Sequence, residues 1–121
     1  MRILIAGAGT VGTQLAGRLC SDDHDVIVVD SHNYRLRKLE EYYDLQILYG
    51  DASSVDILKK VNIEAMDLVI AVTDSDTSNV LIGHLADKMG AKFKIARVRS
   101  SGCFEDPSIL TPFEMGLDKV I

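Results

Sequence analysis

The stretch MRILIAGAGTVG, residues 1–12, joins an apolar run directly to three glycines in the spacing GxGxxG. The run ending at Ala6 predicts a strand, and residues Val11 to Cys20 carry apolar side chains at helical spacing. In such a loop the glycines allow a tight turn, the approach of a pyrophosphate, and close packing of helix on strand. Asp30 ends the next apolar run about 20 residues on, where dinucleotide-binding units place an acid. The stretch therefore predicts a nucleotide-binding strand–turn–helix unit.

The alternation of strand and helix patterns continues along the chain. Most of the short apolar runs are apolar on both faces, which is typical of parallel strands buried between two helical layers. The pattern predicts an α/β fold of Rossmann type, a doubly wound parallel sheet of strand order 3-2-1-4-5-6 in three αβα layers. The expected strands are Ile3–Ala6, Val26–Val29, Gln46–Tyr49, Leu68–Val72, Phe93–Val98 and Lys119–Ile121, and the expected helices are Val11–Cys20, Asn33–Tyr43, Ser54–Val61 and Asp76–Met89.

Local signals refine the third and fourth helices. Ser53 is a candidate cap of the third helix, and Gly90 takes the position that follows the end of the fourth. The fourth helix leaves Val80 on its less buried side, as a candidate contact surface. Its expected buried stripe consists of Leu81, Ile82, Leu85 and Met89.

Residues 100–116 interrupt the alternation of strands and helices. They contain both prolines, and Thr111-Pro112 followed by Gly116 predicts a short capped helix. The chain then stops inside the sixth strand pattern. We therefore expect residues 1–121 to form a single Rossmann domain, and the stop inside a strand pattern favours a fragment of a longer protein.

Composition limits the classes of function. A chain of 121 residues is long enough for one domain with its own core. A net charge of −5 leaves no basic surface for nucleic acid or an anionic membrane, and no apolar run has the length of a membrane span. The histidines and cysteines lack the spacing of metal ligands. We expect a cytoplasmic protein that binds no metal and does not insert into a membrane.

Asp30 narrows the choice of nucleotide. Its carboxylate can accept hydrogen bonds from the hydroxyls of an adenosine ribose, and it would repel a 2′-phosphate. NADP is therefore disfavoured, whereas NAD(H), ATP, ADP and AMP carry the same ribose and stay open. Asp30 can also cap the second helix, a role compatible with ligand binding.

Other polar residues follow the strands whose carboxyl ends meet at one edge of the sheet, where ligands bind in doubly wound folds. Asp51 could accept a hydrogen bond from an adenine amino group, and Ala52 leaves room for the ring. Thr73 and Asp74 follow the fourth strand, and Arg97 could reach a phosphate from the fifth. The alternative roles are a turn, a helix cap and a surface cation.

Several segments together resemble the RCK/KTN (TrkA-N) family of regulatory domains that gate potassium channels and transporters. The glycine loop is shared with many Rossmann proteins, whereas the segments after strands three and four are more specific. The segments are GAGTVG at 7–12, VVD at 28–30, YGDAS at 49–53, AVTDSD at 71–76 with Asn79, and ARVRS at 96–100.

The resemblance implies a cytosolic subunit or domain that binds NAD(H), or in some members ATP or ADP. It also implies homodimers, often assembled into rings, whose ligand-dependent motion opens a membrane potassium channel or transporter. Thr10 stands where ATP-responsive relatives often carry arginine, which favours NAD(H). By matched position the phosphate loop is Gly7, Gly9, Thr10, Val11 and Gly12, the ribose residue is Asp30, the adenine residues are Asp51 and Ala52, and the distal half is lined by Thr73, Asp74 and Arg97.

An enzyme would need a substrate pocket and a proton-transferring residue beside the cofactor. Tyr34 and Lys38 have the spacing of the catalytic pair of short-chain dehydrogenases, but they follow the second strand and are expected at the surface. We therefore expect no catalytic residues. The alternatives are the N-terminal cofactor domain of an NAD-dependent oxidoreductase, an ATP/ADP-sensing gating domain, and an assembly domain that has lost its ligand.

Overall fold

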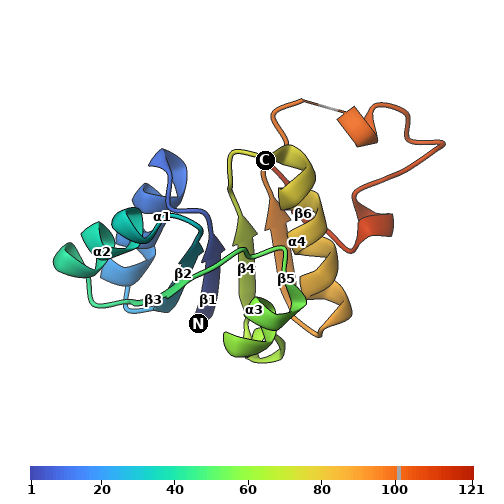
Figure 1. Ribbon diagram of the computed structural model, residues 1–121. Helices are drawn as coiled ribbons and strands as arrows, with labels where there is room; N and C mark the ends of the chain where they lie inside the picture. The colour runs from blue at the N-terminus through green and yellow to red at the C-terminus, as the bar shows by residue number, and fades with distance from the viewer. Residues whose placement is uncertain (101) are drawn as a thin grey trace.

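The computed structural model describes residues 1–100 and 102–121 and contains a six-stranded parallel sheet in the order β3-β2-β1-β4-β5-β6 (Figure 1). The expected fold class and strand order are confirmed. The central strand β1 pairs with β2 on one side and with β4 on the other. The strands are β1 (Arg2–Ala6), β2 (Asp25–Asp30), β3 (Gln46–Tyr49), β4 (Leu68–Ala71), β5 (Phe93–Ala96) and β6 (Lys119–Val120).

Helices cover both faces of this sheet and create two hydrophobic cores. Ile3 and Ile5 of β1 belong to the core under the first two helices, whereas Leu4 and Ala6 belong to the core under the other two. This alternation follows from the period of two along a strand. Within the described ranges, no helix is long and apolar enough to cross a membrane. The helices are α1 (Thr10–Ser21) and α2 (Asn33–Tyr42) on one face, α3 (Val55–Lys60) and α4 (Asp76–Lys88) on the other, and the 3₁₀ turns η1 (Ile63–Ala65), η2 (Gly102–Phe104) and η3 (Phe113–Met115).

The start of α1 lies directly against the end of β1. A Cβ atom added at Gly12 would lie 1.8 Å from the carbonyl oxygen of Gly7, so only glycine permits this approach. Gly7 itself has a φ of +113°, and a Cβ atom there would lie 2.8 Å from the carbonyl oxygen of Val72. These contacts fix the first turn of α1 at the carboxyl end of β1.

The buried face of α4 differs from the expected stripe. Val80 is only 6% exposed and Leu81 is 42% exposed, so Leu81 is the apolar side chain that this helix presents to solvent. The helix has this orientation because Asn79 and Gly83 are buried. The Asn79 side-chain amide is hydrogen-bonded to Thr73 and Arg97 through both its oxygen and its nitrogen. Leu117 packs closely on Gly83. A stripe chosen from apolar residues alone could not include them.

The expected cap of α3 was also wrong. The helix begins at Val55, with Ser54 at its N-cap position. Ser53 lies one residue too early, and its hydroxyl donates to Asp51 Oδ1 at 2.7 Å. Ser53 therefore closes the turn after β3 and leaves the helix N-terminus to its neighbour.

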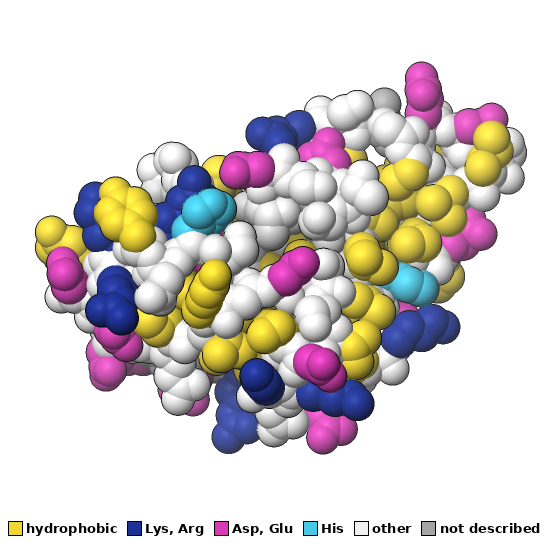
Figure 2. Space-filling model, viewed as in Figure 1, with side chains coloured by type: hydrophobic (Ala, Val, Ile, Leu, Met, Phe, Trp, Pro, Cys, Tyr) yellow, Lys and Arg dark blue, Asp and Glu magenta, His cyan; other side chains and the backbone are white. Residues whose placement is uncertain are grey.

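The connection from β5 to β6 runs outside α4 as an irregular segment with two 3₁₀ turns (Figure 1). The expected short helix is confirmed as η3, which follows Pro112 and ends at Gly116 with a φ of +78°. His84 Nδ1 of α4 lies 2.8 Å from the carbonyl oxygen of Met115. On the face shown in Figure 2, hydrophobic side chains gather where this connection meets α4. Leu81, Leu110 and Met115 are among the residues that line a hollow there.

A buried lysine fastens this connection to the sheet. The Lys94 side chain is 7% exposed, and its Nζ lies 3.0 Å from Asp87 Oδ1 of α4 and 3.2 Å from Asp118 Oδ2. The backbone N–H of Lys94 also donates to Asp118 Oδ2 at 2.8 Å. Burial of the ammonium lowers the pKa of Lys94, but its hydrogen bonds and ion pairs with the two carboxylates outweigh burial and raise that pKa.

Gly12→Ala should destabilise the domain severely, because its methyl group would overlap the Gly7 carbonyl. We expect the free energy of unfolding to fall by about 3 kcal/mol or more, the upper range for overpacked sites. Gly9→Ala is the matched control, since a Cβ atom at Gly9 meets no atom within 4 Å. It should cost about 1 kcal/mol or less, through the poorer N-cap. Urea unfolding measures both, and equal losses would contradict the close approach of α1 to β1.

Lys94→Met should remove part of the loss of stability at alkaline pH. Since the folded-state pKa of Lys94 is raised from 10.5, its contribution is complete below that value and is lost as pH rises through the raised pKa. Urea unfolding between pH 8 and about pH 11.5 should show a steeper decline for the wild type than for this variant. Lys92→Met, which removes an exposed ion pair with Asp67, should keep the steeper decline. Parallel curves for all three proteins would show that Lys94 does not anchor the connection.

Candidate functional site

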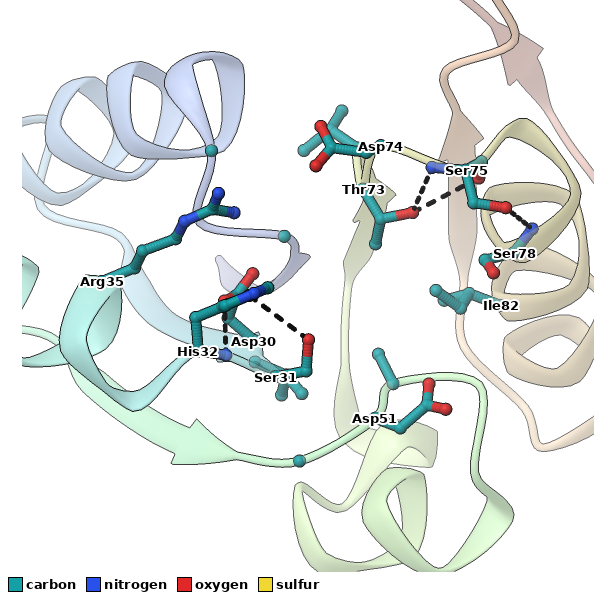
Figure 3. A pocket seen from close by; sticks show the side chains of 16 residues that line it. Asp30, Ser31, His32, Arg35, Asp51, Thr73, Asp74, Ser75, Ser78 and Ile82 are labelled. Atoms are coloured by element: carbon teal, nitrogen blue, oxygen red, sulfur yellow. Dashed lines mark hydrogen bonds and ion pairs between the residues drawn. The ribbon is translucent and has the colours of Figure 1, made fainter.

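A polar cleft of about 310 Å³ opens at the carboxyl ends of β1–β4. It lies where the strand order reverses, because the chain leaves β1 for one face of the sheet and β4 for the other. Its size is at the lower end of small-molecule sites. The cleft is lined by Gly7, Gly9, Val29, Asp30, Ser31, His32, Arg35, Gly50, Asp51, Ala52, Val72, Thr73, Asp74, Ser75, Ser78 and Ile82 (Figure 3).

The structure brings most of the expected site residues together in this cleft. Seven of them line it, from the loops after β1 to β4. Thr10 lies outside and lines an adjoining hollow between α1 and α2. The lining residues do not include Val11, Gly12 or Arg97. The seven lining residues are Gly7, Gly9, Asp30, Asp51, Ala52, Thr73 and Asp74.

Gly9 is the glycine of the loop that the fold does not require. It has an ordinary φ of −77° at the N-cap of α1, and a Cβ atom there would meet nothing within 4 Å. The helical ladder starts when the N–H of Thr13 donates to the Gly9 carbonyl, so the N–H groups of Thr10 to Gly12 have no acceptor within the helix. Free space above unpaired N–H groups at a helix N-terminus suits a phosphate.

Asp30 fixes the loop as well as lining the cleft. It is 8% exposed; its Oδ1 accepts from the N–H of Ala8 at 2.8 Å, and its Oδ2 accepts from the N–H of His32 at 2.8 Å. His32 occupies the N-cap of α2, so Asp30 braces that helix start without being its cap. A carboxylate has about four acceptor positions, which leaves capacity for a ribose hydroxyl.

Asp51 and Ala52 form the wall of the cleft after β3. Asp51 Oδ1 accepts from the Ser53 hydroxyl at 2.7 Å and from the Ser53 N–H at 2.8 Å. These bonds, the hydroxyl first, hold the pKa of Asp51 below its usual value, so the carboxylate is charged at neutral pH. Ala52 is buried. The pair offers one anionic acceptor beside a small apolar surface.

Asn79 holds the loop after β4 in place. Its Oδ1 accepts from the N–H of Thr73 at 2.8 Å and from the Thr73 hydroxyl at 2.6 Å. Its Nδ2 donates to the carbonyls of Thr73 at 3.1 Å and Arg97 at 2.9 Å. Asn79 is completely buried, so these bonds satisfy all four of its capacities in a site without water access. It supports the cleft from behind without lining it.

Arg97 supports the same loop from β5. Its Nη2 donates to the carbonyl of Thr73 at 2.9 Å and lies 3.3 Å from the carbonyl of Val72. Next to it, Arg99 donates to the Asp74 carbonyl and lies 3.7 Å from Asp76. In this arrangement both arginines brace backbone carbonyls behind the cleft. A direct contact of Arg97 with a phosphate stays a prediction.

Nine lining residues are not among the expected site residues, although the segments quoted at 28–30, 49–53 and 71–76 contain four of them. Ser31 and His32 simply continue the chain beyond β2, so the strand-end rule that selected Asp30 could have found them. Ser78 and Ile82 lie one turn apart on α4, and Ile82 was expected only as a member of the buried stripe. Arg35 lies inside α2, where no sequence signal marked it. The nine are Val29, Ser31, His32, Arg35, Gly50, Val72, Ser75, Ser78 and Ile82.

The tyrosine–lysine pair does lie at the surface, as expected. Tyr34 is 70% exposed, and Lys38 Nζ lies 5.7 Å from the centroid of its ring. Both line the hollow between α1 and α2. Over the described part of the chain, no three His, Cys, Asp or Glu side chains are arranged to hold a metal ion.

The sequence matches a known domain family over almost its whole length. The family is the TrkA-N domain, matched by residues 3–121. The Trk system potassium uptake protein TrkA homolog of Archaeoglobus fulgidus is 37% identical over 121 residues, 100% of this chain and 27% of that protein. The TrkA homolog 2 of Methanosarcina mazei is 43% identical over 102 residues, 83% of this chain and 23% of that protein. The chain thus spans about a quarter of the length of these relatives.

Solved structures share the fold. The TrkA-N domain of the inner membrane protein ybaL from Escherichia coli has a TM-score of 0.84 at 21% identity, with 99% of this chain and 85% of that chain covered. The GsuK channel bound to NAD has a TM-score of 0.81 at 22% identity, covering 99% and 21%. The AMP-bound Kef CTD of Shewanella denitrificans has a TM-score of 0.74 at 18% identity, covering 100% and 70%. With the family match over residues 3–121, the chain belongs to the TrkA-N domain family.

Proposed function

We propose that this domain binds NAD(H) in the cleft at the ends of β1–β4 and regulates a potassium transport protein of the membrane. The observation that carries the proposal is the free space at Gly9. Gly7 and Gly12 are required by the fold, whereas Gly9 leaves open space above the N-terminus of α1, where a pyrophosphate would lie. The protein is proposed to be a regulatory module and not an enzyme.

The acidic side of the cleft favours NAD(H) over NADP(H). Asp30 is buried and held by two backbone N–H groups, so it cannot turn away from a ribose 2′-phosphate. Repulsion between its charge and that phosphate would be strong at low exposure. The GsuK channel, which shares this fold, is described as bound to NAD, which supports the same ligand here.

Adenine mononucleotides are the second candidate, because the half of the cleft around Asp30 and Asp51 would take any adenosine. The volume of about 310 Å³ is small for a whole dinucleotide. The Kef CTD with this fold is described in an AMP-bound form. An ATP- or ADP-responsive domain is therefore the alternative, ahead of a cofactor domain of an oxidoreductase.

The hydrogen bonds behind the cleft suggest how binding would reach a partner. The loop carrying Thr73 and Asp74 is tied through Asn79, Arg97 and Arg99 to the segment that leaves β5. A ligand touching this loop would favour one position of that segment. It can shift the balance between two states only by its difference in affinity for them. We propose a cytoplasmic homodimer or ring in contact with a membrane potassium channel or transporter.

The first test is calorimetric titration of the purified domain with NAD⁺, NADH, ATP, ADP and NADP⁺, with light scattering to follow assembly. The proposal predicts binding of NAD⁺ or NADH and exclusion of NADP⁺. Preference for ATP or ADP would move the function to energy sensing on the same fold. Failure of every nucleotide to bind would reject the proposal and leave an assembly domain.

Gly9→Val tests the placement of the phosphates. Its branched side chain would fill the free space above α1, so NAD⁺ affinity should fall by about 2 kcal/mol or more, some thirtyfold. The fold should survive, since the site is open and φ is ordinary. Unfolding curves check this in the same preparation. Normal NAD⁺ affinity in a folded Gly9→Val protein would show that the phosphates lie elsewhere.

A further inference from the structure

Arg35 occupies the passage between two hollows of the surface. The nucleotide cleft and the hollow between α1 and α2 have three lining residues in common: Gly9, Arg35 and Asp74. A ligand that extends from the cleft across the glycine loop must pass these residues. Figure 3 shows the Arg35 side chain extending from α2 toward the segment that leads into α1, with Asp74 on the opposite side of the cleft.

The charges around this passage are unequal. Asp30, Asp51 and Asp74 are acidic lining residues of the cleft, and Arg35 is the single Lys or Arg among the described residues that line it. Among the described residues, no carboxylate lies within ion-pair distance of the Arg35 guanidinium. The side chain is half-buried, and a guanidinium held there without an acceptor suits an anionic ligand.

We propose that Arg35 binds a phosphate of the nucleotide as it crosses Gly9, and that Asp74 opposite limits the number of phosphates the site accepts. The proposal rests on nucleotide binding in the cleft, and it names the residues that distinguish ligands by their phosphate charge. The N–H groups at the start of α1 and the planar guanidinium would hold one phosphate from two sides. Each further phosphate would bring more negative charge toward the Asp74 carboxylate. The site therefore takes NAD(H), AMP or ADP in preference to ATP.

The test compares adenosine, AMP, ADP, ATP and NAD⁺ on three variants of the purified domain. Arg35→Gln should weaken AMP, ADP and NAD⁺ by about tenfold, the usual size of a lost charged hydrogen bond, and leave adenosine unchanged. Asp74→Asn should strengthen binding, by the largest factor for ATP and not at all for adenosine. Arg37→Gln is the matched control, because Arg37 lies on the same helix, is exposed and lines neither hollow. It should change none of the affinities.

Several outcomes would overturn the assignment. An equal loss of adenosine and AMP in Arg35→Gln would show that Arg35 shapes the cleft without reading phosphate, and unchanged AMP affinity would remove it from the site. If Arg35→Gln fails to fold, Arg35→Lys and the salt dependence of the wild-type AMP affinity decide, since a charge contact weakens with added salt. Wild-type protein that binds none of the five ligands would instead reject the function on which this inference rests.

Discussion

The approach of α1 to β1 is the constraint on which the rest of the structure depends. Gly12 lies against the Gly7 carbonyl, the Gly7 N–H donates to the carbonyl of Val29 at 2.8 Å, and the Ala8 N–H donates to Asp30 at 2.8 Å. The loop is thus held by two hydrogen bonds to the end of β2 and by the close approach of its own helix. Only Gly9 is left without a packing role, and it faces the cleft at the positive end of α1. The packing of the first helix therefore also creates the free space in which the proposed phosphate would lie.

The sheet and its helices could be predicted because their signals are local. Strands β1 to β4 read as continuous apolar runs, and glycines mark the turns between elements. The orientation of α4 could not be predicted this way. Asn79 is buried because Thr73 and Arg97 satisfy its amide, and Gly83 is buried because Leu117 packs on it. Those partners are brought close only by the finished sheet, so the spacing of apolar residues along one helix does not contain them.

In the cleft, too, some lining residues could be predicted from local sequence patterns and others only from the folded chain. The carboxyl ends of parallel strands meet at one edge of the sheet, so the sequence could predict that Asp30, Asp51 and Asp74 line the same cleft. Arg35 reaches the cleft from inside a helix, and Arg97 turns behind it to two carbonyls. For an arginine, the sequence pattern predicts where the backbone lies, but the guanidinium at the end of the long side chain can lie in several places. Only the structure therefore separates Arg35, which lines the cleft, from Arg97, which braces the loop behind it.

The edge strand β6 is joined to the sheet less extensively than the central strands. β6 pairs with β5 through only two residue positions, and Lys94 ties its approach to α4 through Asp87 and Asp118. The strands around the cleft are instead joined by longer ladders and two continuous cores. A ladder of two positions is expected to open at a lower free energy than these longer ladders. Amide protons of β6 would then exchange with solvent before those of β1, while the cleft keeps its shape.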